Sequence, residues 1–318
     1  MKWNFFRDYT VWDTAGWNKI SFAPKDAVRT IENSYGKKEV KPFGFAELRR
    51  LASAKRSGEA GSPSRARAGQ PAFAEASARS PCHSSPCQAT GHSGEGEIKI
   101  CAFLLHNNFN CPDPQKEVQW VIDVIKTAED LKIPAIRIDA ITKGEKEEPF
   151  EIRVTRFVDC MRQALEATNA STVALGIENH GIQGNDPAFL KQVMERVGNE
   201  RLGVNMDTGN FYWNGFPLNE VYDILRSVAP YTKHTHVKNI RYPEDTRQQK
   251  RANGWEYGKY VSPIYEGDID HQQVVAILKN AGYNGPLTIE DECLGKLDAD
   301  QKKEVLRKDA VYLNSLLA

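Results

Sequence analysis

The stretch Val-Ala-Leu-Gly-Ile-Glu, residues 173–178, is a short apolar run that ends in a carboxylate. Similar runs with donor side chains recur in Leu-Gly-Val-Asn-Met-Asp at 202–207, His-Thr-His-Val-Lys at 234–238 and Leu-Thr-Ile-Glu at 287–290. Strands this apolar are buried on both faces, as they are in an α/β barrel. Because the C-terminal ends of barrel strands converge on one mouth, the four runs predict that their donor side chains meet there.

Around these runs, short β-branched segments alternate with amphipathic helical stretches from about residue 97 onward. This alternation is typical of repeated βα units around a parallel sheet. The expected elements are strand 98–105, helix 114–131, strand 133–138, helix 149–167, strand 173–177, helix 187–197, strand 202–206, helix 218–228, strand 232–237, helix 271–281, strand 286–289 and a final helix ending near residue 317. A closed barrel of eight strands needs two more, which we expect at 3–12 and 39–43, with helices at 24–34 and 45–54.

Residues 53–96 differ in composition from the rest of the chain, because Gly, Ser, Ala, Arg and Pro dominate and Phe73 is the only large apolar residue. Such a segment cannot offset its ordering entropy by burying apolar surface. We therefore expect one (β/α)8 TIM-barrel domain over residues 1–318, with a low-complexity, disordered insertion at 53–96 between its second helix and third strand. Cys82, His83 and Cys87 in this segment fit no standard zinc spacing.

The bulk composition favours a cytoplasmic protein with a small-molecule partner. The chain has 42 basic and 42 acidic residues, so no global field attracts nucleic acid or an anionic membrane. The N-terminal sequence lacks the apolar stretch of a signal peptide, and no run approaches the roughly 18 apolar residues of a membrane span. The six cysteines are dispersed, which indicates reduced thiols. The sequence is also compatible with a homo-oligomer.

The four strand-end donors are Glu178, Asp207, His236 and Glu290. Three carboxylates and one imidazole at a common mouth predict a site for one divalent metal ion. Oxygen-rich mixed coordination suits Mn²⁺, Mg²⁺ or Co²⁺, with Zn²⁺ as an alternative, whereas a purely structural zinc site would usually show several cysteines.

Four short motifs accompany these strand ends: Glu-Asn-His-Gly at 178–181, Asp-Thr-Gly-Asn at 207–210, His-Val-Lys-Asn at 236–239 and Glu-Gly-Asp-Ile-Asp at 266–270. In order and spacing they resemble those of the xylose-isomerase-like sugar phosphate isomerase/epimerase superfamily. The resemblance runs from Ile98 to the C-terminus, is weaker for residues 1–52 and is absent from 53–96. It implies a TIM-barrel enzyme in which the four strand-end donors hold a single catalytic divalent metal ion.

The resemblance further implies a sugar or sugar phosphate isomerase or epimerase in which Glu178 and Glu290 transfer the proton. A metal ion chelated by a sugar's carbonyl and neighbouring hydroxyl acidifies the intervening C–H and stabilises the enediolate formed when that proton leaves. One carboxylate can then act as base on one face and another as acid on the opposite face.

Side chains just beyond the ligands are expected to bind the substrate. By the resemblance, His180 contacts substrate hydroxyls; a loop histidine bonded to backbone is the alternative. Lys238 lies two residues after His236 and shares its side, where an ammonium could hold a hydroxyl, carboxylate or phosphate. Asn210 stands where many epimerases have a histidine, which leaves its substrate contact open.

Further candidates are Arg241, which could act as Lys238 does, and His106, at the end of the strand expected at 98–105. Arg137 could instead form a buried ion pair with Asp139 or Glu178. The long loop 239–265 carries the aromatic residues Tyr242, Trp255, Tyr257 and Tyr260. These aromatic residues could stack on a sugar as part of a lid, or pack the loop against its own barrel.

Three other functions compete with this prediction. A DNA-repair phosphodiesterase of the endonuclease IV type is disfavoured, because Asn210 replaces a metal-binding histidine of its Asp-Thr-Cys-His motif and no histidine occurs between Val237 and Asp270. A metal-dependent dehydratase of a keto-polyol, similar to inosose dehydratases, would use the same enediolate chemistry. A non-catalytic sugar-binding barrel is disfavoured by the presence of all four expected ligands.

Overall fold

The computed structural model describes residues 100–141, 144–145 and 147–317. The strands expected at 3–12 and 39–43, the helices that accompany them and the insertion expected at 53–96 lie outside these residues.

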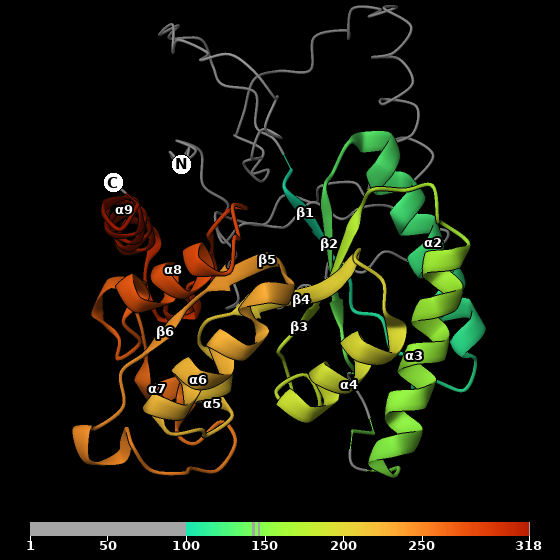
Figure 1. Cartoon of the computed structure of the whole chain (residues 1–318). Helices are drawn as coiled ribbons and strands as arrows, with labels where there is room; N and C mark the ends of the chain where they lie inside the picture. Colours follow the sequence, from blue (N-terminus) through green and yellow to red (C-terminus); the bar gives the residue numbers. More distant parts are fainter. Residues whose placement is uncertain (1–99, 142–143, 146, 318) are drawn as a thin grey trace, which may run out of the picture.

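Six parallel strands form one sheet in the order β1-β2-β3-β4-β5-β8; Figure 1 labels β1 to β5 of this sheet. The six strands are β1 (Ala102–Leu104), β2 (Ala135–Asp139), β3 (Ala174–Glu178), β4 (Leu202–Asp207), β5 (Thr232–Val237) and β8 (Thr288–Ile289). All six were predicted, with ends that differ by a few residues. Neighbours in the sheet are parallel and alternate with helices along the chain, which confirms the predicted βα architecture of the TIM-barrel fold.

The strand register brings the functional strand ends to the same edge of the sheet. Asp139 at the end of β2 pairs with Glu178 at the end of β3, and Asp207 on β4 pairs with His236 on β5. The backbone N–H of Glu290, just after β8, donates to the Val237 carbonyl at 2.9 Å. The polar side chains therefore start from adjacent points along this edge.

Helices pack around the sheet, with α2 beside α3, α3 beside α4 and α6 beside α8 (Figure 1). They are α2 (Pro114–Leu131), α3 (Phe150–Glu166), α4 (Pro187–Val197), α5 (Asn210–Trp213), α6 (Leu218–Val228), α7 (Tyr257–Tyr260), α8 (His271–Asn280) and α9 (Ala299–Ser315). The bounds predicted for α2, α4 and α6 are confirmed. Asp186 caps α4 and Asp270 caps α8 by accepting backbone N–H groups, as these residue types do at helix N-termini.

The segment 239–265, expected as a loop, contains further short elements. An antiparallel hairpin joins β6 (Asn239–Ile240) to β7 (Val261–Ser262), and α7 lies between its two strands. The Arg251 guanidinium lies over both the Tyr212 and the Tyr242 ring, with its carbon 4.5 and 4.4 Å from their centroids, and the two rings contact each other edge-to-face at 5.0 Å. Of the two alternatives for this segment, the structure shows that most of its aromatic residues pack against the barrel.

The main apolar core lies between the sheet and its helices. It includes Phe157 of α3, which packs edge-to-face against Phe109 at 5.3 Å and against Phe189 of α4 at 5.6 Å between ring centroids. A separate small apolar cluster involves α9 and contains Val237, Ile264, Ile289, Ala310 and Leu313. Within the described ranges, no helix combines the length and the apolar character needed to cross a bilayer.

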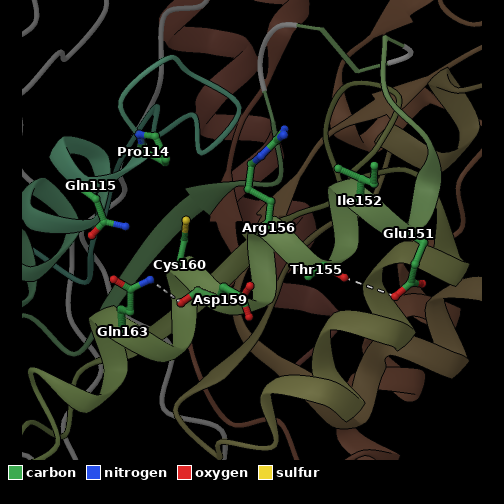
Figure 2. Close-up of a pocket in the computed structure, with 9 residues that line it drawn as sticks. All are labelled: Pro114, Gln115, Glu151, Ile152, Thr155, Arg156, Asp159, Cys160 and Gln163. Atoms are coloured by element: carbon green, nitrogen blue, oxygen red, sulfur yellow. Dashed lines mark hydrogen bonds between the residues drawn. The ribbon is translucent and has the colours of Figure 1, made fainter.

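A groove of about 480 Å³ lies on the outside of the barrel between α2 and α3 (Figure 2). Its lining residues are Pro114, Gln115, Glu151, Ile152, Thr155, Arg156, Asp159, Cys160 and Gln163. It contains none of the predicted site residues, so the candidate chemistry lies elsewhere, at the carboxyl edge of the sheet.

Candidate metal centre

Glu178, Asp207, His236 and Glu290 converge at the carboxyl ends of β3, β4, β5 and β8. Each offers one ligand atom, and all four atoms lie within 4.8 Å of one another. All four residues belong to the sheet edge described above, and we call them the ligand cluster. Their convergence is what the strand-end pattern predicted.

Local hydrogen bonds fix the backbone around the ligand cluster. Asn179 Nδ2 donates to the Asp207 carbonyl at 2.9 Å, and the Asp207 N–H donates to Asn179 Oδ1 at 2.7 Å. Asp207 Oδ1 accepts the backbone N–H groups of Gly209 and Asn210, both at 2.8 Å. One oxygen of Asp207 is therefore used to shape the following turn, and the other, Oδ2, is directed to the cluster.

The ligand cluster has excess negative charge and buried oxygen atoms without hydrogen-bond partners among the described residues, and both features suit a bound cation. Asp207 Oδ2 and Glu290 Oε2 are buried and make ion-pair contacts with Lys238 Nζ, at 3.1 and 2.9 Å, that lack hydrogen-bond geometry. Burial, joined by the charges of Glu290 and Glu178, raises the pKa of Asp207 well above its usual range despite the nearby Lys238 ammonium. Negative charge thus exceeds what the neighbouring cations compensate, and a divalent ion fits the donor set.

Arg137, on β2, fixes the position of Glu178. Its guanidinium pairs with Glu178 Oε2 and lies 3.0 Å from Asp139 Oδ1, while Nη1 donates to the Leu105 carbonyl at 2.8 Å. Burial alone would raise the pKa of Glu178, but Arg137 and His236 outweigh it and the pKa lies well below the usual range. The buried ion pair considered from the sequence is confirmed, and it involves both carboxylates.

His236 completes the same arrangement. Its Nδ1 lies 2.8 Å from Glu178 Oε1 and 3.4 Å from Glu290 Oε2, whereas Nε2 is buried without a hydrogen-bond partner. Burial opposes protonation of the imidazole, but Glu290 and Glu178 outweigh it and raise its pKa to about 10. Without a metal ion, a proton on His236 can therefore partly offset the excess negative charge.

Asp139, which the sequence predicts only as a partner of Arg137, connects the two predicted substrate-binding histidines. Its carboxylate lies 2.9 Å from His106 Nδ1 and 3.5 Å from His180 Nδ1. Asp139, Glu178 and His180 also form a second group of three ligand atoms within 4.8 Å of one another. The sequence signal was present, because Asp139 directly follows a predicted strand just as Glu178, Asp207 and Glu290 do.

Lys238 and Glu292 form the opposite side of the centre. Lys238 is buried, and its ammonium contacts Glu292 in addition to Asp207 and Glu290. A Cβ at Gly209 would lie 2.5 Å from Lys238 Cγ, so glycine there lets the lysine cross above Asp207. Sequence reasoning missed Glu292, although it follows Glu290 by two residues as Lys238 follows His236.

The other three residues predicted to bind substrate are Asn210, Arg241 and Trp255, and they have different surroundings. Asn210 begins α5, and its buried Nδ2 has no hydrogen-bond partner. Arg241 is exposed beside the β6–β7 hairpin, where its charge acts on Asp268. Trp255 stacks on Tyr260 with 5.6 Å between ring centroids. The structure thus brings Asn210 next to Asp207, whereas Trp255 packs within the segment 239–265 and the charge of Arg241 acts on Asp268 beyond it.

Comparisons with known proteins agree with this fold. The family model described as a xylose isomerase-like TIM barrel matches residues 87–316. The uncharacterized protein MJ1311 of Methanocaldococcus jannaschii is 24% identical over 162 residues, which is 50% of this chain and 50% of that protein. The chain thus spans about half the length of this curated relative.

Two solved structures are similar at low sequence identity. A xylose isomerase domain protein from Planctomyces limnophilus has a TM-score of 0.52 and 20% identity, covering 69% of this chain and 78% of that chain. An L-ribulose 3-epimerase has a TM-score of 0.52 and 14% identity, covering 69% of this chain and 75% of that chain. At these low sequence identities, the similarity to the two structures shows a shared fold only.

Proposed function

Because this chain belongs to the xylose isomerase-like TIM barrel family, we propose that it is a divalent-metal-dependent sugar isomerase or epimerase. The observation that carries the proposal is the ligand cluster, whose four donor atoms lie within 4.8 Å of one another at the edge of the sheet where TIM-barrel enzymes place their active sites.

The ligand cluster would hold one Mn²⁺, Mg²⁺ or Co²⁺ ion, with Zn²⁺ as an alternative, since its donors are three carboxylates and one imidazole. Bound there, such an ion supplies a Lewis acid that polarises a substrate carbonyl and lowers the pKa of the adjacent C–H. The protein's own side chains then have to bind the sugar, orient it and move the proton.

Glu178 and Glu290 are the two carboxylates proposed to move the proton. Glu178 is only 2% exposed and is fixed by Arg137 on one oxygen and His236 on the other. Glu290 is 12% exposed at its side chain, so it is the more accessible of the two. A carboxylate on each side of the reacting carbon would allow the proton to leave one face and return to the same or the opposite face.

Substrate hydroxyls would be oriented by His180, His106 and Asn210. Asp139 contacts both histidines, and this contact fixes their ring orientation. The amide nitrogen of Asn210 is buried without a partner, which leaves a donor available beside Asp207. These hydrogen-bonding side chains can discriminate between sugar epimers by the hydroxyl positions they contact.

One observation favours dehydration as a second candidate reaction. Burial opposes protonation of His180, but Asp139 and Glu178 outweigh it and raise the pKa of this histidine. An imidazolium at this place could protonate a departing β-hydroxyl as a general acid. The product would then be a keto compound instead of an isomer, and product analysis by NMR separates the two reactions.

Solvent deuterium exchange into a panel of ketoses tests the proposed function. Metal-loaded protein should incorporate deuterium beside the carbonyl, and metal-stripped protein should not. Glu290→Gln should lower the exchange rate by at least about 100-fold, the usual range for removing a general acid or base. Glu195→Gln on the outer face of α4, an exposed position, is the matched control. Full-rate exchange by Glu290→Gln would remove that residue from the reaction.

A further inference from the structure

The Lys238 ammonium is the most heavily neutralised cation of the centre. Its side chain is 4% exposed, and it contacts Asp207 Oδ2 at 3.1 Å, Glu290 Oε2 at 2.9 Å and Glu292 Oε1 at still closer range. Two of these carboxylates belong to the ligand cluster and would be shared with a metal ion. Glu292 does not belong to the cluster, so it stays as the counter-ion of Lys238 when metal binds.

Among the described residues, the summed charge of the centre also leaves no free positive charge for a substrate group. In the part of the chain that the structure describes, its carboxylates are Asp139, Glu178, Asp207, Glu290 and Glu292, and its permanent cations are Arg137 and Lys238. A divalent ion leaves one excess negative charge among these groups, and protonation of His180 would bring them only to neutrality. An anionic substrate group would meet no uncompensated positive charge on this side of the centre.

A tyrosine from the segment 239–265 reaches the same place. The Tyr257 hydroxyl is buried beside Glu292 and Lys238, and Glu292 acts on it both through its charge and as a hydrogen-bond partner. Its ring packs edge-on against Trp213, with 6.5 Å between centroids, which anchors the side chain to α5. Burial raises the pKa of this phenol well above its usual range, so it stays an uncharged donor and acceptor.

We propose that Lys238, Glu292 and Tyr257 bind an uncharged hydroxyl group of the substrate, and that Glu292 determines this specificity by cancelling the charge of Lys238. The substrate would then be an unphosphorylated, uncharged ketose or polyol. This inference rests on the proposed function for the identity of the site, and it adds the substrate class.

The chemistry of the three groups fits a hydroxyl better than an anion. A hydroxyl can donate to the Glu292 carboxylate while it accepts from Lys238 or Tyr257, so every partner is satisfied. A phosphate or carboxylate can only accept, and it would be buried beside the like charges of Glu292 and Glu290. Buried polar groups left unpaired by the wrong ligand give strong discrimination.

Calorimetric titration of the metal-loaded protein with a neutral ketose and with its phosphate ester tests the inference without requiring turnover. Wild type should bind the neutral sugar more tightly than the ester. Glu292→Gln should improve affinity for the ester at least about tenfold, which corresponds to about 1.4 kcal/mol. Glu195→Gln, exposed on α4, should leave both affinities unchanged.

Two further variants keep the test decisive if Glu292→Gln alone folds poorly. Tyr257→Phe should lower the affinity for the neutral sugar without raising the affinity for the ester, because it removes a hydroxyl group and no charge. Combining Glu292→Gln with Lys238→Met should abolish the gain for the ester, because the unmasked ammonium is gone. Tighter binding of the ester by wild type, or unchanged selectivity in Glu292→Gln, overturns the inference.

The same samples separate this inference from the proposed function when deuterium exchange is measured beside binding. The expected shift in selectivity without exchange into any sugar would support the binding site and contradict isomerase chemistry. Exchange into neutral sugars with unchanged selectivity in Glu292→Gln would support the chemistry and overturn the role of Glu292. If neither the neutral sugar nor its phosphate ester binds, both the proposed function and the inference about Glu292 are overturned.

Discussion

Replacing Asp207 by asparagine should stabilise the metal-free protein while it abolishes stabilisation by metal. The substitution keeps the size of the side chain and lets Oδ1 continue to accept the N–H groups of Gly209 and Asn210. It removes one negative charge from a buried cluster that has too many. Most buried substitutions are destabilising, so a gain would be a specific signature of this electrostatic argument.

The expected magnitude follows from the distances in the centre. At an effective dielectric constant of about 20, Asp207 is repelled by Glu178 and by Glu290, within 4.8 Å, by about 3.5 kcal/mol each. Lys238, at 3.1 Å, attracts it by about 5 kcal/mol under the same assumption. Repulsion therefore exceeds attraction by about 1–2 kcal/mol, to which the desolvation of the buried carboxylate adds.

The pH dependence has a definite sign. The pKa of Asp207 is raised in the folded protein, so its carboxylate destabilises the fold only when it is ionised. This destabilisation is absent below the unfolded pKa near 3.8 and grows as pH rises above it. The stability advantage of Asp207→Asn over wild type should therefore be present at neutral pH and shrink as the solution is acidified toward pH 4. A protonated His236, within the same 4.8 Å, attracts Asp207 by about 3.5 kcal/mol at this dielectric constant, so the advantage of asparagine persists because desolvation, the largest cause of the raised Asp207 pKa, outweighs this attraction.

Thermal and urea unfolding, each with and without Mn²⁺, measure both effects. Without metal, Asp207→Asn should unfold about 2–8 °C higher than wild type, from 1–2 kcal/mol and about 2–4 °C per kcal/mol at this chain length. At a metal concentration of about 100 times the Kd, only wild type should gain about 2.7 kcal/mol. Asp223→Asn on α6, with a side chain 76% exposed, is the control. A metal-free Asp207→Asn protein less stable than wild type, or one that metal still stabilises, would refute the reasoning.

Two other substitutions test the surrounding charges. Arg137→Met should lower the free energy of unfolding by about 3–5 kcal/mol in urea titrations, because Asp139 and Glu178 lose a buried partner; the exposed control Arg226→Met should change it by less than about 0.5 kcal/mol. Burial and Asp291 raise the pKa of Asp309 to about 9, so wild-type stability should fall as pH rises toward 9, and Asp309→Asn should flatten this dependence. Equal slopes of unfolding free energy against pH in the two proteins would contradict that assignment.

The parts of the fold with a strong periodic signal were predictable from the sequence. Helices α2, α4 and α6 begin and end where their apolar stripe and their proline or capping residues indicate. The convergence of Glu178, Asp207, His236 and Glu290 was predictable because each lies at or directly after the end of a predicted strand, and parallel strands bring such ends together. Short elements such as α5 and the β6–β7 hairpin were missed, because four or two residues carry no period.

The polar surroundings of the ligands were harder to predict, because they depend on distances across the sheet. The sequence shows Arg137, Asp139 and Glu178 as separate residues, and only the pairing of β2 with β3 makes them one network. Tyr257 reaches Glu292 because the hairpin and Arg251 fold the segment 239–265 back onto the barrel. Packing of this kind has no local sequence signature.

Equilibrium dialysis against Mn²⁺ tests the central claim most directly, with one conservative substitution at each of the four ligands and Glu195→Gln as the control. Wild type and the control should bind one ion per chain at the same affinity, and each ligand variant should bind at least about tenfold more weakly, a loss of about 1.4 kcal/mol. Absence of binding by wild type, or unchanged affinity in all four variants, would show that these side chains do not hold a common ion.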